Sequence, residues 1–173
     1  MPPDPKKLRR AQIRDAFVYW VSIPGAVLLG GIVLDRLLHL SPFRKEWTIT
    51  GMALLLILSG VWLITVAMKD LARYGEGTPN PLAPPRKLVT QGSYRLCRHP
   101  LFFGYDAAAL GIVLLLHSPG TLCIAYPLFL LLQVRFLKKE EAHLARRFPQ
   151  EFPAYKERVP FLFPFSLPWR GKG

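Results

Sequence analysis

The side chains best suited to chemistry lie in one short stretch, where a basic segment runs into an apolar one. Arg98 supplies a fixed cation and His99 a titratable imidazole, and Pro100 follows directly. Proline is favoured at the first position of a helix, because the amide hydrogen that it lacks would have no partner there. The residues after Pro100 are almost entirely apolar. The stretch therefore predicts a polar site at the start of an apolar helix.

Three carboxylates are candidates to act with this stretch. Asp106 lies seven residues after His99, so both side chains fall on one face of a helix. A carboxylate within an apolar helix needs a partner, so Asp106 either contacts a substrate amine or makes a structural hydrogen bond to a neighbouring helix or water. Glu140 and Glu141 follow a later apolar run. Adjacent residues of a helix point about 100° apart, so we expect one of the two to face the site.

Four apolar runs of 17 to 22 residues must position these side chains. They cover residues 16–34, 47–68, 101–117 and 121–137. At about 1.5 Å per residue, each is close to the hydrocarbon thickness of a bilayer. In the first run, Pro24 and Gly25 predict a kink, and Gly30-Gly31 a close approach of a neighbouring helix. The short connections predict two antiparallel hairpins, so the expected fold class is an all-α integral membrane protein with four transmembrane helices.

The whole chain, residues 1–173, is expected to form one membrane domain. Its parts are a basic leader, a first helical hairpin, a long loop on the side of the site, a second hairpin and an interfacial C-terminal segment. These parts cover residues 1–15, 16–68, 69–99, 100–137 and 138–173. The long loop is rich in proline, which favours an ordered, extended path that walls a site. Residues 138–159 are expected to form an interfacial helix broken by Pro149 and Pro153.

The distribution of positive charge predicts the topology. The chain has a net charge of +12, and 20 of its 23 Lys and Arg residues lie in the leader, the long loop and the segment from Arg135 onward. Because basic residues accumulate on the cytoplasmic side, both termini and the long loop should face the cytoplasm, from an inner or plasma membrane. Arg98-His99 and Glu140-Glu141 would then meet on the same membrane face.

Other classes of function lack their usual signals. The basic residues flank apolar runs and form no nucleic-acid-binding motif, so no nucleic acid partner is expected. Cys97 and Cys123 do not form a metal-binding pair or a disulfide framework. His39, His117 and His143 share no ligand spacing, so no metal site is expected.

Several motifs together resemble a known superfamily. In order, they are Gly77-Thr78-Pro79-Asn80-Pro81, Pro84-Pro85-Arg86-Lys87-Leu88-Val89-Thr90-Gln91-Gly92-Ser93-Tyr94, Arg98-His99-Pro100, Glu140-Glu141-Ala142-His143-Leu144, Tyr155 and Val159-Pro160. Over roughly residues 70 to 164, the chain resembles the isoprenylcysteine carboxyl methyltransferase and phospholipid methyltransferase superfamily. The resemblance implies an integral-membrane enzyme with a cytoplasm-facing pocket for S-adenosylmethionine and a lipid-phase entrance for a hydrophobic substrate.

The resemblance also implies roles for individual residues. By position, it points to Tyr94, Arg98, His99, Glu140 and Glu141 as residues that bind the cofactor or support catalysis. With Val89 and Pro100 added, the candidates for cofactor binding are Val89, Tyr94, Arg98, His99, Pro100, Glu140 and Glu141. The candidates for catalysis are Arg98, Glu141 and, from its place within an apolar helix, Asp106. Their side-chain types suit the cofactor. Cationic and N–H donors match its carboxylate, the glutamates match its ribose diol and amine, and apolar or aromatic side chains match its adenine.

The expected function is transfer of a methyl group from S-adenosylmethionine to a lipophilic acceptor. The acceptor could be a phospholipid amine, an isoprenylcysteine-like carboxylate or another hydrophobic molecule. A membrane lipid reductase of the sterol-reductase type, which uses NADPH, is the alternative enzyme. A non-catalytic membrane scaffold or lipid-binding protein is the alternative from another class. The sequence does not predict the oligomeric state.

Overall fold

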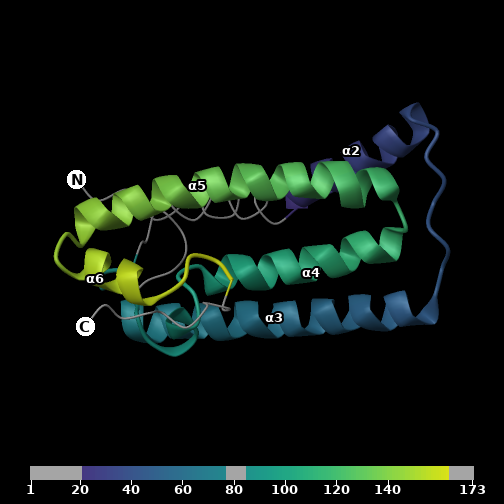
Figure 1. Ribbon diagram of the computed structural model, residues 1–173. Helices are drawn as coiled ribbons and strands as arrows, with labels where there is room; N and C mark the ends of the chain where they lie inside the picture. Colours follow the sequence, from purple (N-terminus) through teal and green to yellow (C-terminus); the bar gives the residue numbers. More distant parts are fainter. Residues whose placement is uncertain (1–20, 77–84, 164–173) are drawn as a thin grey trace, which may run out of the picture.

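The computed structural model describes residues 21–76 and 85–163, and within these ranges the chain is helical and contains no strand (Figure 1). Four predicted parts lie outside the described residues: the leader (residues 1–15), the start of the first span (residues 16–20), the loop motif of residues 77–81 and the end of the C-terminal segment. The helices are α2 (Ile23–Leu37), α3 (Trp47–Gly75), the short 3-10 helix η2 (Gly92–Arg95), α4 (Pro100–Leu116), the π-helical turn η3 (Thr121–Ala125), α5 (Tyr126–Arg147) and α6 (Glu151–Arg158).

Helix α3 is longer than the predicted run of residues 47–68. It continues to Gly75, so residues 69–75, which were assigned to the long loop, are helical. Lys69 and Asp70 mark the end of the apolar stretch, but charged residues do not end a helix. The helix stops where Glu76 takes a left-handed conformation with φ 55°.

Helix α5 likewise continues past the predicted end of its apolar run at Leu137. It extends to Arg147, so Glu140 and Glu141 lie on the same helix as the apolar residues before them. The chain breaks around Pro149, as predicted. Pro153 does not break α6, because it lies in the first turn of that helix, where no amide donor is needed.

The most extensive helix packing joins α3 to α4, through small residues. Gly60 lies against Gly104 and Ala108, and a Cβ atom built at Gly60 would lie 2.4 Å from the Gly104 carbonyl oxygen. Further along, Gly111 lies equally close to the backbone at Ala53. Only glycine allows two backbones to approach this closely, so these residues fix α4 against α3.

Helix α2 packs mainly against η3 and the start of α5, whereas α3 packs mainly against α4. Within the described residues, α2 and α3 therefore do not form the closely packed pair that the predicted hairpin over residues 16–68 suggests. The described helix begins at Ile23, and Pro24 lies in its first turn. Of the pair Gly30-Gly31, Gly31 allows the predicted close approach, because a Cβ atom there would lie 2.1 Å from Thr121 Oγ1, whereas a Cβ atom at Gly30 would have no neighbour within 4 Å.

Asp35 of α2 binds the start of the helix formed by η3 and α5. Its Oδ1 accepts a hydrogen bond from the Gly120 amide at 2.6 Å, and its Oδ2 accepts one from the Ser118 hydroxyl. The first amides of a helix have no partners within the helix, so a carboxylate supplied by another helix caps them.

Within the described residues, two helices are long and apolar enough to cross a membrane, judged by length and composition. They are α3 and the continuous helix formed by η3 and α5. Helix α4 is apolar but shorter, at 17 residues. Figure 1 shows α3, α4 and α5 running side by side, with α6 and the end of α5 at one end of the bundle.

Candidate active site

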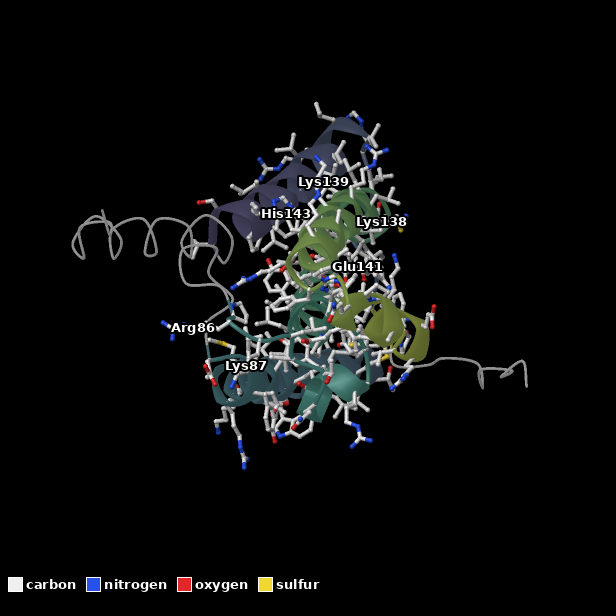
Figure 2. All side chains as sticks on the ribbon, turned by 90° about the vertical axis from the view of Figure 1, so that its left-hand side faces the viewer. Arg86, Lys87, Lys138, Lys139, Glu141 and His143 are labelled. Atoms are coloured by element: carbon white, nitrogen blue, oxygen red, sulfur yellow. The ribbon has the colours of Figure 1, made fainter. Side chains whose placement is uncertain are left out.

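The candidate site lies where three segments meet at the end of the bundle that carries α6. The segments are residues 92–99, the last third of α5, and residues 155–161. Figure 2 views this end: Glu141 lies in its interior, whereas Lys138, Lys139 and His143 of the same helix lie on the outside. The topology predicted from the sequence placed Arg98-His99 and Glu140-Glu141 at one end, and the structure brings Arg98 and His99 into contact with Glu141.

Arg98 joins all three segments. Its Nε donates a hydrogen bond to Glu141 Oε1 at 2.5 Å, and its Nη1 donates to the carbonyl oxygens of Lys156 and Val159 at 3.0 and 2.5 Å. Its backbone amide donates to the Pro160 carbonyl at 2.8 Å. The guanidinium also lies over the Phe161 ring, 5.5 Å from its centroid. Arg98 therefore holds the C-terminal segment against α5.

His99 is buried beside this ion pair. It precedes Pro100, the first residue of α4, and the ring lies edge-on to Phe161 and Phe102 with centroids 5.0 and 6.3 Å away. Its Nε2 lies 3.5 Å from Glu141 Oε1, which is longer than a good hydrogen bond. This atom is buried and has no hydrogen-bond partner among the described residues. A buried polar atom without a partner is costly, so the site suits a polar ligand here.

The two glutamates differ in their surroundings, and both lie beyond the predicted membrane span. Glu141 is buried, and Glu140 is half-buried. Burial acts against ionisation of Glu141, but its contacts with His99 and Arg98 outweigh burial and lower its pKa to about 2. Burial raises the pKa of Glu140, and the charge of Glu141 adds to that effect, although His99 and His143 act against it. Glu141 is thus held ionised, while Glu140 can change its protonation state more easily.

Tyr94 lies in η2 and is fixed by its backbone. Its carbonyl oxygen accepts a hydrogen bond from the Tyr155 hydroxyl of α6 at 2.7 Å. Burial raises the pKa of the Tyr94 hydroxyl, and the charges of Glu140 and Asp70 raise it further. Tyr94 is therefore protonated at neutral pH and lies within electrostatic reach of Glu140.

The other two candidates for cofactor binding are buried anchors. The Val89 side chain packs against the end of α3, where a Cβ atom built at Gly75 would lie 2.8 Å from Val89 Cγ2. The Gly75 carbonyl accepts hydrogen bonds from the amides of Arg86 and Lys87, which ties the loop back to α3. Pro100 is fully buried at the start of α4.

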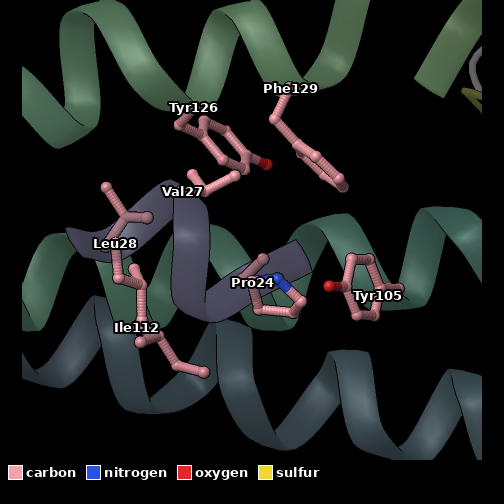
Figure 3. A pocket seen from close by; sticks show the side chains of 9 residues that line it. Pro24, Val27, Leu28, Tyr105, Ile112, Tyr126 and Phe129 are labelled. Carbon is pink, nitrogen blue, oxygen red and sulfur yellow. The ribbon is translucent and has the colours of Figure 1, made fainter. Parts of the chain in front are cut away.

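Asp106 lies apart from this cluster, within the bundle. The Gln133 side-chain amide of α5 donates to both carboxylate oxygens, at 2.9 and 2.8 Å, and all of these atoms are buried. The Tyr126 hydroxyl donates to the Asp106 carbonyl oxygen at 2.9 Å. The structure thus contains the hydrogen bond to a neighbouring helix that was one of the two interpretations of Asp106. Figure 3 shows the small apolar pocket nearby, between α2, α4 and α5, lined by Pro24, Val27, Leu28, Tyr105, Ala109, Ile112, Val113, Tyr126 and Phe129.

Sequence reasoning missed two residues that hold the site together. Asp70 follows the predicted apolar run of residues 47–68 and was given no role, yet its carboxylate accepts two hydrogen bonds from Ser93, from the amide and the hydroxyl, both at 2.7 Å. Ser93 lies in the motif but was given no role. A single glycine before it, Gly92 with φ 61°, was the available signal of a tight turn. Among the described residues, no group of three or more His, Cys, Asp or Glu side chains is placed to hold a metal ion.

Comparison with known proteins gives the family. Residues 48–151 match the phospholipid methyltransferase family. The chain is 33% identical over 132 residues to the cobalt-zinc-cadmium resistance protein CzcN of Cupriavidus metallidurans, covering 75% of this chain and 58% of that protein. It is 30% identical over 130 residues to the rat protein-S-isoprenylcysteine O-methyltransferase, covering 72% of this chain and 44% of that one.

A plant relative is similar at the same level. The protein-S-isoprenylcysteine O-methyltransferase B of Arabidopsis thaliana is 28% identical over 127 residues, covering 70% of this chain and 62% of that one. The chain thus covers less than two thirds of each of these three relatives. No solved structure matches it. Because the family match includes more than half of its residues, this chain belongs to the phospholipid methyltransferase family.

Proposed function

We propose that the protein is an integral-membrane methyltransferase that transfers a methyl group from S-adenosylmethionine to a lipophilic acceptor. The family match and the names of the isoprenylcysteine methyltransferases among its relatives support this activity. One structural observation supports a specific location for the cofactor site. His99 and Glu141 are buried side by side where three segments meet, and His99 Nε2 has no hydrogen-bond partner among the described residues.

The residues around this pair fit the chemistry of S-adenosylmethionine. In our proposal His99 and Arg98 face the cofactor carboxylate, and Glu140 and Glu141 accept hydrogen bonds from its amine and ribose hydroxyls. Val89 and Tyr94 supply the apolar and aromatic surface for adenine, next to the buried Pro100. When bound, the cofactor supplies a methyl group that its sulfonium already activates.

The protein contributes mainly charged side chains that are held in fixed positions and partly shielded from water. Arg98 keeps Glu141 ionised and in one place, and Phe102 and Phe161 shield His99 from water. Charges that are held in position before the reaction cost no rearrangement when it occurs. Precise orientation of two reactants can itself supply up to about 7 to 11 kcal/mol in the best intramolecular cases.

There is room for a small molecule at this end of the protein. A pocket with a volume of about 600 Å³ lies between the end of α3, residues 86–91 and the junction of α5 and α6, with Arg86, Gln91 and Phe148 among its lining residues. Its lining includes none of the seven residues proposed above to bind the cofactor, so this pocket does not define the proposed site.

The membrane topology belongs to the same proposal. We place four spans at residues 16–34, 47–68, 101–117 and 121–137, with both termini and the site on the cytoplasmic side. The two long apolar helices and the positive charge at the end that carries the site support this arrangement. Asp106 would lie within the third span, where we propose that it contacts the acceptor. A contact of this kind suits an amine better than a carboxylate, because a carboxylate repels a second one.

Calorimetric titration of the detergent-purified protein with S-adenosylhomocysteine tests the cofactor site. We expect micromolar binding that is lost in His99→Ala and Glu140→Ala and kept in Lys139→Ala. Lys139 is a suitable control because it lies on the same helix but is exposed. No binding of S-adenosylhomocysteine, with binding of NADPH instead, would favour the reductase. A folded protein that binds neither would favour the scaffold.

A further inference from the structure

We propose that Asp70 is a positioning residue of the cofactor site, which sets the turn that carries Tyr94 and leads into Arg98-His99. This inference rests on the proposed function, because it assigns Asp70 a role in binding S-adenosylmethionine. Asp70 lies on α3, more than one helical turn before its end at Gly75. The site residues lie on other segments, so Asp70 links the site to the best-packed helix pair of the fold.

The first argument is the geometry of the contact. Asp70 Oδ2 accepts hydrogen bonds from both the backbone amide and the hydroxyl of Ser93, each at 2.7 Å. Ser93 is buried, and η2 has no side-chain cap from its own preceding residue, Gln91. Asp70 therefore performs for η2 the function that an N-cap residue performs for a helix, but from a different element.

The second argument is how closely the turn fits around the carboxylate. Gly92 has φ 61°, a conformation that favours glycine. A Cβ atom built on Gly92 would lie 2.3 to 2.6 Å from the three atoms of the Asp70 carboxylate group. The backbone at Gly92 can thus pass Asp70 only because no side chain intervenes. The turn has one position relative to α3, and Asp70 defines it.

The third argument is what the turn carries. Tyr94 follows Ser93 directly, and its carbonyl accepts the hydrogen bond from Tyr155 of α6. Arg98, four residues further on, binds Glu141 and the C-terminal segment. A shift at Ser93 would move Tyr94 relative to Glu140 and loosen the contact with α6. Positioning errors of about 1 Å are enough to weaken a preorganised site strongly.

The chain offers a matched control for the same chemistry in another place. Asp35 also caps a turn from a neighbouring helix, by accepting hydrogen bonds from the Gly120 amide and the Ser118 hydroxyl. It does so at the end of α4 opposite to His99. Loss of Asp35 should therefore destabilise the fold without affecting the cofactor.

The test compares binding of S-adenosylhomocysteine with melting temperature for four variants in detergent. We expect Asp70→Ala to weaken binding at least about tenfold, the scale of losing a hydrogen bond to a charged group, and Ser93→Ala to weaken it less. Asp70→Asn should bind within about threefold of the unmodified chain, because one amide oxygen can accept both hydrogen bonds. Asp35→Ala should lower the melting temperature and leave binding unchanged.

The outcomes separate this inference from the proposed function. If the unmodified protein binds no S-adenosylhomocysteine, both are overturned. If it binds, and Asp70→Ala binds equally well, only the role of Asp70 is overturned. Parallel losses of binding and stability in Asp70→Ala and Asp35→Ala would also overturn it, because Asp70 would then act through general stability.

If Asp70→Ala does not fold, Ser93→Ala and Asp70→Asn provide the test. Two quantities are measured in these variants: the amide hydrogen exchange of Ser93 and Tyr94, and the binding of S-adenosylhomocysteine. Faster exchange with weaker binding in Ser93→Ala is expected, and unchanged values in that variant would contradict the proposal.

Discussion

The ion pair between Arg98 and Glu141 should be the most costly single contact in the described structure to break from one side. The two side chains are only 9% and 7% exposed, and the Arg98 guanidinium also binds two backbone carbonyls. Removing one partner of a buried pair typically costs about 3 to 5 kcal/mol, because the other charge stays buried without compensation. We expect this cost for Arg98→Met, which keeps the apolar stem but removes the charge and the donors.

The structure predicts that the partner substitution recovers part of this loss. In Arg98→Met, the basic side chains that remain beside Glu141 are Lys156, with Nζ 3.5 Å from Oε2, and His99, with Nε2 3.5 Å from Oε1. Glu141→Gln removes the uncompensated carboxylate. The double variant should therefore be more stable than the sum of the single effects by about 1 to 3 kcal/mol.

Thermal unfolding of the four proteins in one detergent measures this cycle. For a chain of this length, about 3 to 5 kcal/mol corresponds to a fall in melting temperature of roughly 6 to 20 °C. The exposed pair of Lys87 and Glu76 is the control, and Lys87→Met should leave the melting temperature unchanged within error. A coupling near zero, or an Arg98→Met variant as stable as Lys87→Met, would refute the assignment of Arg98 as a buried link.

Two further predictions concern the carboxylates. Asp106→Asn should lower turnover far more than affinity for S-adenosylhomocysteine, because Asn can still accept a hydrogen bond from Gln133 and keep the helices in place. Steady-state kinetics would measure turnover and calorimetry would measure affinity. Unchanged turnover would leave Asp106 with a structural role alone. Glu141 has a lowered pKa, so it should stabilise the folded protein above pH 4.5 and lose that contribution as the pH falls toward about 2. Glu140 has a raised pKa, so its contribution to the stability of the folded protein should decrease as the pH rises past 4.5. The measurement is the melting temperature of the unmodified protein minus that of the variant, at each pH. This difference should fall toward low pH for Glu141→Gln and toward high pH for Glu140→Gln, and parallel curves would contradict the assignment.

The sequence predicted the apolar helices but not where they end. Hydropathy reports the change from apolar to polar surroundings, which occurs at Lys69 in α3 and at Lys138 in α5. A helix ends for other reasons, such as the left-handed residue Glu76 after α3 or Pro149, two residues beyond the end of α5. Both helices therefore continue by seven and ten residues into segments that were read as loop or as a separate helix.

The meeting of Arg98 and His99 with Glu141 was predictable, because the motif residues lie at the same ends of helices joined by a tight turn. The contacts that fix them were not. Arg98 binds the carbonyl oxygens of Lys156 and Val159, and a backbone acceptor leaves no trace in side-chain identity. Asp70 and Ser93 are 23 residues apart, and Asp106 and Gln133 are 27 apart. Contacts between residues so far apart along the chain depend on how the elements pack, which sequence patterns indicate only in general terms.

The continuity of α5 has a consequence for how this protein can vary. A single unbroken helix joins the residues beside the apolar pocket to Glu141, so the number of residues between them sets both their separation and their angle. Inserting one residue would move Glu141 by about 1.5 Å and turn it by about 100°, away from Arg98. The side chains of this helix can therefore change to suit a different acceptor. The number of residues in it is fixed, because Glu141 must keep pointing toward Arg98.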